Sequence, residues 1–330
     1  MRYQYTSLHN MRGIAAFFVV LLHAGLTKYI FFSYALQVGL IFSPVRIFFL
    51  ISGFLIPMSI AKYGIQNFLI SRIFRLIPVM LFIDLLIFAD IRAIVLSVTS
   101  LFNWFQKSPV SHVYWSLEIE YIFYLFFTLS CVIYRKVNTI NVCITILLIV
   151  TIYIISSIIQ LQTSTILLSH YLNSITFLMS GSVFYFFHLH TKRYIKYVLA
   201  LFTVLLSCFF AIIFSQNGIN FNIEENLNKV YQILLFANWG PALKYWLLES
   251  CAIIPFFIGY KFLKFNNSIL SFLGNISYPL YLIHTHILKV LDFNILTKLL
   301  AIVISIFLSH LIHKFIEVPM VSYGKKMLKA

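Results

Sequence analysis

The sequence predicts an all-α polytopic membrane protein with about ten transmembrane helices and with both termini in the cytoplasm. Composition is the first observation that leads to this fold class, because 61% of the 330 residues are hydrophobic and only 10% are charged. Mean hydropathy is +0.95, which excludes the soluble globular class. The other two observations are the length of the apolar windows and the distribution of lysine and arginine between them.

The apolar windows are long enough to cross a bilayer, and 330 residues accommodate about ten helices of ~20 residues with short loops. The third window is interrupted by Asp84, Asp90 and Arg92. The predicted helices span residues 12–30, 36–60, 76–97, 113–133, 140–160, 165–188, 195–215, 241–262, 269–290 and 295–315.

Loop charges test this count, since cytoplasmic loops of membrane proteins are enriched in lysine and arginine. With both termini inside, sixteen basic residues lie on the cytoplasmic side and six on the other. The sixteen are Arg2, Arg12, Lys62, Arg72, Arg75, Arg135, Lys136, Lys192, Arg193, Lys196, Lys261, Lys264, Lys314, Lys325, Lys326 and Lys329; the six are Lys28, Lys107, Lys229, Lys244, Lys289 and Lys298. The net charge of +15 therefore reports topology, with some attraction to anionic lipids, and not nucleic-acid binding.

Nothing in the sequence divides the chain into parts. It contains no internal repeat, low-complexity segment or soluble domain, so residues 1–330 are predicted to form one transmembrane domain with no appended soluble domain. The first helix carries ionisable groups and lacks a small-residue cleavage site, unlike a cleaved signal peptide. The four cysteines lie in or beside apolar runs without the spacing of a metal site or disulfide framework: Cys131, Cys143, Cys208 and Cys251.

The first predicted helix contains the most informative stretch, which begins with Arg12 and ends with His23. An ionisable side chain at membrane depth is costly and marks function by default. A rise of ~1.5 Å per residue places His23 roughly 16 Å from Arg12 along the helix. The alternative is that His23 only forms a hydrogen bond with a neighbouring helix.

Two carboxylates, Glu118 and Glu120, open the otherwise apolar fourth helix. Counted from Val113, Glu120 lies roughly 10 Å below the external face, and His23 has about the same depth when counted back from a helix end near Ile30. A carboxylate that orients an imidazole is a recurring catalytic arrangement, so we predict that Glu120 pairs with His23. Glu118 is nearer the interface and is expected to be solvated.

Two further motifs precede this helix. Arg72 and Arg75 share one helix face, and their planar charged forks suit phosphate groups, although a purely topological role is the alternative. Ser52 and Gly53 permit close helix approach and supply a hydroxyl, with ordinary packing as the alternative.

The remaining candidates lie in the second half. The loop from Ser215 to Gly240 contains Glu224, Glu225, Asn238 and Trp239, which can contact an acceptor or simply be solvated. His284 lies in the ninth helix, and His313 and Glu317 are four residues apart and can pair on one face. No histidine pair has a supporting cysteine or third ligand, so we expect no metal.

These motifs, taken in order, resemble over essentially the whole length the acyltransferase family 3 membrane proteins, which include bacterial O-antigen and exopolysaccharide O-acetylases. The matching motifs are Arg12-Gly13-Ile14-Ala15-Ala16 followed by His23, Phe48-Phe49-x-x-Ser52-Gly53-Phe54, Arg72-x-x-Arg75-x-x-Pro78, Trp115-Ser116-Leu117-x-x-Glu120-x-x-Phe123-Tyr124, Ile276-Ser277-Tyr278-x-Leu280-Tyr281-x-x-His284 and Glu317-x-Pro319.

The resemblance implies an O-acetyltransferase of the bacterial inner membrane. Such a protein transfers an acyl group, usually acetyl, from a cytoplasmic coenzyme A thioester to a carbohydrate hydroxyl at or beyond the outer face. The resemblance also implies that His23 matches the essential histidine and that Arg72 and Arg75 match a donor-binding pair. Arg12, Ser52 and Gly53 join them as expected donor-site residues, and the other candidates are Trp115, Tyr124, Tyr281, His284 and Glu317.

Three departures from the family pattern stand out. His9 occupies a position that is acidic in many relatives, so a charge partner for Arg12 must come from elsewhere. Glu118 replaces a residue that is commonly small. The sequence ends soon after the last helix, so we expect it to lack the hydrolase-like domain that some relatives append.

The residue types also fit a mechanism. A sugar hydroxyl becomes a good nucleophile when a positioned base accepts its proton, and we assign this role to His23, oriented by Glu120. Ser52 or Arg12 would stabilise the oxyanion, and a covalent acyl-enzyme is the alternative to direct transfer. A transporter or flippase that uses the buried ionisable residues is the competing function. The acceptor can also be peptidoglycan, a lipid-linked intermediate or a small molecule.

Overall fold

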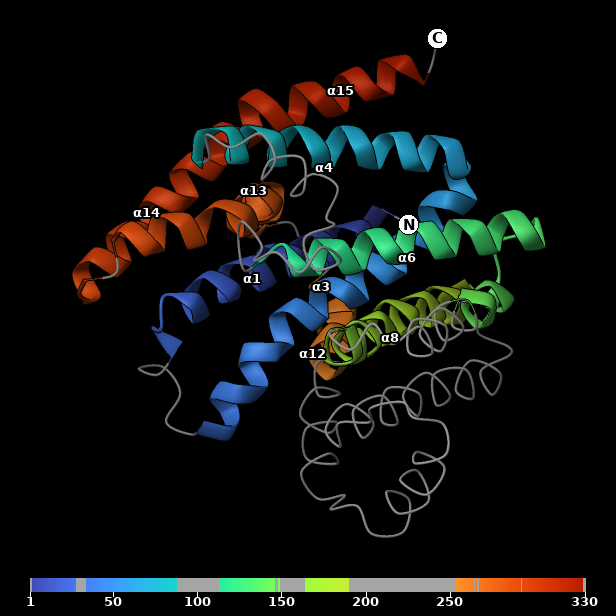
Figure 1. Cartoon of the computed structure of the whole chain (residues 1–330), viewed down its shortest axis with the longest axis horizontal. Coiled ribbons are helices and arrows are strands. Elements are labelled where there is room, and N and C mark those ends of the chain that lie inside the picture. Colours follow the sequence, from blue (N-terminus) through green and yellow to red (C-terminus); the bar gives the residue numbers. More distant parts are fainter. Residues whose placement is uncertain are drawn as a thin grey trace. The chain divides into compact units, whose positions relative to one another are not determined.

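The computed structural model describes residues 2–27, 34–87, 113–145, 148, 164–189, 253–263, 265, 267–291 and 293–328 (Figure 1). The helices of this part are α1 (Arg2–His23), α3 (Tyr34–Tyr63), α4 (Ile65–Ile87), α6 (Trp115–Tyr134), α8 (Ser164–Leu189), α12 (Ile253–Phe262), α13 (Ser268–Val290), α14 (Ile295–Ile312), the π-helix η2 (His313–Glu317) and α15 (Val318–Met327). No strand occurs among these residues, so the all-α prediction is confirmed for them.

Three of the described segments are long and apolar enough to cross a membrane: Pro44–Tyr63, Trp115–Tyr134 and Ile295–Met327. The predicted helix at 195–215, most of that at 140–160 and the start of that at 241–262 lie outside the described residues, as does the loop from Ser215 to Gly240. The count of ten spans and the cytoplasmic termini stay predictions.

The chain forms two compact units, which we describe separately. The first comprises Met1–Phe48, Lys62–Glu118 and Ala252–Ala330, and the second comprises Phe49–Ala61 and Ile119–Cys251. Helices α3 and α6 each contribute residues to both units.

Helices α1 and α13 form the centre of the first unit and run parallel to each other. Contacts advance in the same direction along both, from His9 with Ser271 to His23 with His284. A Cβ atom on Gly13 would lie 2.6 Å from the Gly274 backbone nitrogen, so the missing side chain is what lets the two backbones approach. Parallel packing is what a ten-span topology requires of its first and ninth helices.

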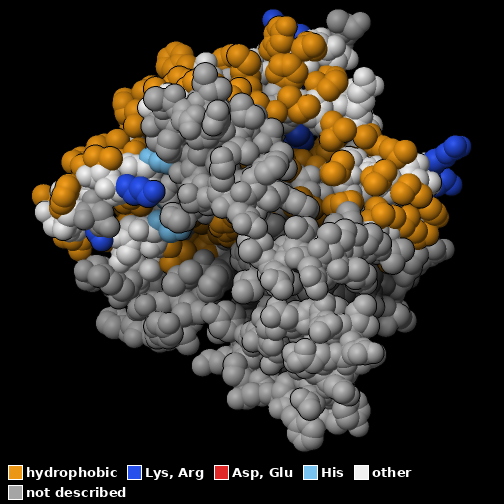
Figure 2. Space-filling view, viewed as in Figure 1, with side chains coloured by type: hydrophobic (Ala, Val, Ile, Leu, Met, Phe, Trp, Pro, Cys, Tyr) orange, Lys and Arg blue, Asp and Glu red, His pale blue; other side chains and the backbone are white. Residues whose placement is uncertain are grey.

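Helix α14 packs against this pair through small side chains. Ala301, Ser305 and Ser309 are buried, whereas Val303 and Phe307 on the other side of the helix are more than half exposed. Figure 2 shows apolar side chains over much of the described surface that faces the viewer. Small residues between helices and large apolar residues outside are typical of helices that pack in lipid.

The first helix ends earlier than predicted, at His23 and not near residue 30. Gly25 adopts a positive φ of 67°, its N–H donates to the Leu22 carbonyl, and the Leu26 N–H donates to the Leu21 carbonyl. These paired bonds are a Schellman motif, which terminates an α-helix. The predicted depth of His23 assumed a helix end near residue 30, so this depth estimate no longer holds.

The third predicted helix begins earlier than expected, because α4 starts at Ile65 and not at residue 76. Gly64, with φ of 82°, separates it from α3. The last predicted helix, at 295–315, continues through η2 into α15. Pro319 has no N–H and its ring crowds the preceding turn, and the wider π-turn lies directly before it. Helix α15 then packs alongside α4, with the Phe74 and Tyr323 rings 5.6 Å apart (Figure 1).

In the second unit, Gly53 packs directly on α8. A Cβ atom there would lie 1.8 Å from the Leu178 carbonyl oxygen, and one on Gly181 would lie 2.2 Å from that of Leu50. The Ser182 hydroxyl donates to the Gly53 carbonyl at 2.8 Å. Gly53 therefore has a packing role in this unit, and Ser52 beside it is partly buried.

Candidate active site

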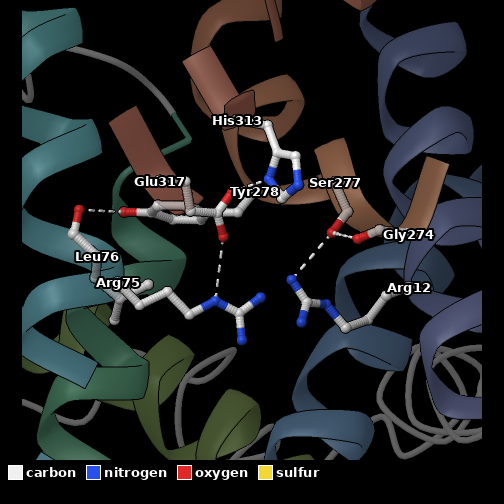
Figure 3. A network of polar contacts seen from close by, with 8 residues as sticks. All are labelled: Arg12, Arg75, Leu76, Gly274, Ser277, Tyr278, His313 and Glu317. Carbon is white, nitrogen blue, oxygen red and sulfur yellow. Dashed lines mark hydrogen bonds and ion pairs between the residues drawn. The ribbon is translucent and has the colours of Figure 1, made fainter. Parts of the chain in front are cut away.

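Arg12 is held by α13. Its Nη2 donates to the Ser277 hydroxyl at 3.0 Å, and that hydroxyl donates to the Gly274 carbonyl at 2.8 Å (Figure 3). Ser277 is fully buried, so it is a fixed point for the guanidinium group. Ser277 gives Arg12 a neutral hydrogen-bond acceptor, and the charge partner that the sequence predicts for Arg12 elsewhere in the chain stays a prediction.

Arg75 is held by Glu317. Its Nε lies 3.4 Å from Oε1 of Glu317, while Nδ1 of His313 lies 2.8 Å from Oε2. The predicted pairing of His313 with Glu317 is confirmed. Glu317 is only 4% exposed, and a buried carboxylate is tolerated when it is paired with cations and hydrogen-bonded. It therefore fixes Arg75 of α4 against η2.

Arg12 and Arg75 point toward one region of the first unit (Figure 3). Figure 3 shows Arg12 from α1 and Arg75 from α4 extending toward the same space from opposite sides, with Glu317 on one flank and Ser277 on the other. Burial, together with the positive charges of Arg12 and Arg75, lowers the pKa of nearby His9. We call Arg12, Arg75, Ser277 and Glu317 the arginine cluster; its two cations face one carboxylate, so it is positively charged.

Arg72 lies one turn before Arg75 on the same helix. Its guanidinium carbon lies 5.2 Å from the centre of the Phe68 ring, a cation–π geometry. The structure therefore places both predicted donor-binding arginines on α4, and it joins Arg75 with Arg12 in one cluster.

His23 and His284 form a pair farther along the same two helices. Nδ1 of His23 lies 2.8 Å from Nε2 of His284, and the rings stack with their centres 5.0 Å apart. His284 is completely buried, and its Nδ1 lies 2.9 Å from the Leu280 carbonyl oxygen. His23 is exposed. We call these two residues the histidine pair.

Tyr281 connects α13 to the start of α6. Its hydroxyl lies 2.7 Å from the Ser116 hydroxyl and donates to the Val113 carbonyl at 3.1 Å. Its ring centre is 6.1 Å from that of His284. Trp115, beside Ser116, is partly buried. Tyr278, one turn earlier, donates to the Leu76 carbonyl of α4 at 2.9 Å (Figure 3). These bonds fix the helix that carries His284.

The carboxylates of α6 lie in different surroundings. Glu118 is 4% exposed, so the expectation that it is solvated is wrong. Glu120 belongs to the second unit, where it accepts a hydrogen bond from the Tyr124 hydroxyl. His23 belongs to the first unit, so the pairing of Glu120 with His23 stays a prediction. Asp84 of α4, also buried, accepts a hydrogen bond from Tyr114 at 2.7 Å.

The sequence predicts His284 as a candidate site residue but does not predict its contact with His23. A signal was available, because two apolar helices each carry a histidine beyond a residue of the arginine cluster: His23 follows Arg12, and His284 follows Ser277. No group of three or more histidine, cysteine or acidic side chains is arranged to hold a metal ion in the part of the chain that the structure describes.

The fold and the site define a membrane protein in which α1 and α13 carry the histidine pair together with Arg12 and Ser277 of the arginine cluster, while Arg75 comes from α4 and Glu317 from η2. A family model described as an acyltransferase domain matches residues 5–314, so the chain belongs to acyltransferase family 3. The family supports acyltransferase activity, and the apolar helices support a multi-pass membrane protein. No curated protein and no solved structure matches the chain.

Proposed function

We propose that the protein is a bacterial inner-membrane O-acyltransferase. It moves an acyl group, acetyl in the first instance, from cytoplasmic acyl-coenzyme A to a hydroxyl of a cell-surface carbohydrate such as O-antigen, capsule or exopolysaccharide. The observation that carries this proposal is the arrangement of Arg12 and Ser277 of the arginine cluster, and of the histidine pair, along α1 and α13.

The arginine cluster is the proposed donor-binding site. Coenzyme A carries a diphosphate and a further phosphate, and guanidinium groups bind phosphate through paired charged hydrogen bonds. Arg12 and Arg75 approach the same space from two helices, so an anion between them can contact both (Figure 3). Glu317 and Ser277 hold the two side chains in place and lower the entropy lost on binding.

The histidine pair lies at a suitable distance from this cluster. His23 follows Arg12 by eleven residues within one helix, which corresponds to roughly 16 Å at ~1.5 Å per residue. The extended pantetheine arm of coenzyme A separates its phosphates from its thioester. A donor whose phosphates contact the arginine cluster can therefore present its thioester near His23.

His23 is the proposed general base. Its Nε2 accepts the proton of the acceptor hydroxyl while the hydroxyl oxygen attacks the thioester carbonyl. The tetrahedral intermediate collapses, the carbon–sulfur bond breaks, and the His23 imidazolium returns the proton to the departing thiolate. The products are the O-acyl ester and free coenzyme A, and the enzyme is unchanged.

The distance between the arginine cluster and the histidine pair bears on the two predicted oxyanion donors, Arg12 and Ser52. Arg12 is bound to Ser277, a helix segment away from His23, so it serves the donor phosphates and not the oxyanion. Ser52 belongs to the second unit, so its role as an oxyanion donor stays a prediction that rests on its hydroxyl alone.

Mass spectrometry of surface polysaccharide tests the function. Polysaccharide from cells that lack the gene should lose acetyl groups, and these should return with the wild-type protein but not with His23→Ala at equal membrane abundance. Identical polysaccharide with and without the gene would contradict a carbohydrate acceptor. Purified protein that leaves acetyl-coenzyme A intact but moves a substrate across vesicles would favour a transporter.

A further inference from the structure

We infer that His284 is the positioning residue for His23, selecting the tautomer and ring orientation in which His23 Nε2 accepts a proton. This inference rests on the proposed function, because it assigns a partner to the proposed base. It follows from the hydrogen bonds of the histidine pair and from the burial of its two members.

The tautomer follows from the direction of two hydrogen bonds. The Leu280 carbonyl can only accept, so Nδ1 of His284 carries the proton in that 2.9 Å contact. In a neutral ring the other nitrogen, Nε2, then has a lone pair. Nδ1 of His23, at 2.8 Å, must donate to it. His23 is thereby left with its own lone pair on Nε2, which is the atom that the reaction requires.

Neutral His284 is the favoured form at this position. Its side chain is completely buried, and an imidazolium without an anionic partner is costly there. The contacts that the structure gives His284 among the described residues are with His23, Leu280 and Tyr281, none of which carries a negative charge. His284 can therefore act as a hydrogen-bond acceptor toward His23.

His284 is also rigidly placed. The residues from Ile276 to His284 on α13 are buried without interruption, and Tyr281 is bonded to both Val113 and Ser116. A buried partner on a hydrogen-bonded helix segment restricts the ring it contacts, which is the requirement for a positioned catalytic group. The stacked rings, inclined by 22°, add to this restriction.

Exposure separates the two roles. A base must reach the acceptor hydroxyl, and His23 is exposed at the end of α1 whereas His284 is inaccessible. During the reaction the proton moves from the hydroxyl to Nε2 of His23 and later to the thiolate. His284 only accepts the Nδ1–H bond, which strengthens when His23 becomes positively charged. Its own protonation state does not change.

Solid-state NMR of the full chain in lipid bilayers reads the tautomer directly. Protein labelled with ¹³C,¹⁵N-histidine should show His23 protonated at Nδ1 and unprotonated at Nε2, assigned by loss of its signals in His23→Gln. In His284→Leu, which removes the acceptor, this tautomer should give way to Nε2–H or to a mixture. Wild-type His23 protonated at Nε2 would overturn the inference.

Kinetics provide the second readout. His284→Leu should lower kcat by ~10²- to ~10⁴-fold, the range for loss of a partner that orients a catalytic histidine. The KM for acetyl-coenzyme A should be unchanged, because the arginine cluster is intact. His284→Gln offers an amide oxygen to the Nδ1–H of His23, so its kcat should be at least tenfold higher than that of His284→Leu. Equal kcat in the Gln and Leu variants, or a kcat near wild type in both, would overturn the positioning role.

His286→Leu is the matched control, since it removes a partly buried histidine from the same helix two residues away. Its kcat should be that of the wild type. If the His284→Leu variant does not insert into the membrane, the His23 tautomer in the wild-type NMR spectrum alone supports or overturns the inference. If the wild-type protein shows the expected His23 tautomer but transfers no acyl group, the proposed function is refuted while the pairing of His23 with His284 still holds. Transfer that requires His23 but tolerates His284→Leu would refute only the inference.

Discussion

Single residues define what the site can do. Arg12 and Arg75 come from helices distant in the sequence, yet each is held by a buried polar partner, Ser277 or Glu317. Mutual repulsion of two guanidinium groups is offset by the Glu317 carboxylate, which leaves the cluster with a positive charge for an anionic ligand. We therefore predict that the positive charge of Arg12 and Arg75 binds the donor and does not contribute to the chemical step.

Arg12→Ala and Arg75→Ala should each raise the KM for acetyl-coenzyme A by about 10- to 100-fold with little change in kcat. Loss of a charged hydrogen bond costs about 1.5–3 kcal/mol, and the contacts lie far from the reacting atoms. Arg72→Ala should have a smaller effect, because its side chain lies over Phe68. Steady-state kinetics in proteoliposomes measure this.

Lys325→Ala, which removes an exposed cation from α15, serves as the control and should leave KM unchanged. An unchanged KM in Arg12→Ala and Arg75→Ala, with normal protein in the membrane, would return these arginines to a topological role.

Helices position these residues, and the sequence predicted their existence better than their ends. Apolar windows identified the segment of α1, but the Schellman motif at Gly25 stops it at His23. The equal depth assigned to His23 and Glu120 depended on a longer helix. His284, which contacts His23 in the structure, lies 261 residues away, and periodicity within one helix cannot predict which other helix packs against it.

Close packing at Gly53 favours a packing role for this residue, and a variant tests that role against donor binding. Gly53→Ala should destabilise the protein by about 1–3 kcal/mol, as overpacked interiors do, because a Cβ atom would overlap the Leu178 carbonyl. Thermal unfolding in detergent should show a lower midpoint than for Ser59→Ala on the same helix. A stable Gly53→Ala variant with a raised KM for the donor would instead assign Gly53 to donor binding.

The whole molecule must orient these helices in a membrane. Parallel packing of α1 and α13 requires that both helices cross the membrane in the same direction. The predicted topology meets this requirement, because its first and ninth spans are both odd-numbered. The all-α class could be predicted from composition, because mean hydropathy and the length of the apolar windows can be read directly from the sequence. The order of contacts between helices comes from tertiary packing, and residue patterns encode it only weakly.

Topology reporters test this orientation. Fusions after Arg75, Lys136, Arg193, Lys264 and Lys329 should report the cytoplasm, and fusions near Lys107 and Glu225 should report the outside, because positive charges are retained inside. Inversion at any one of these positions would contradict the ten-span topology.

Acyl transfer by the His23→Gln variant tests the central claim most directly. Purified protein in proteoliposomes is given acetyl-coenzyme A with a radiolabelled acetyl group and surface polysaccharide from cells that lack the gene. Wild-type protein should label the polysaccharide. His23→Gln keeps hydrogen bonding but cannot accept the proton, so its kcat should fall by ~10²- to ~10⁴-fold while donor binding persists. Labelling by His23→Gln at a rate close to that of the wild type would contradict the assignment of His23 as the base.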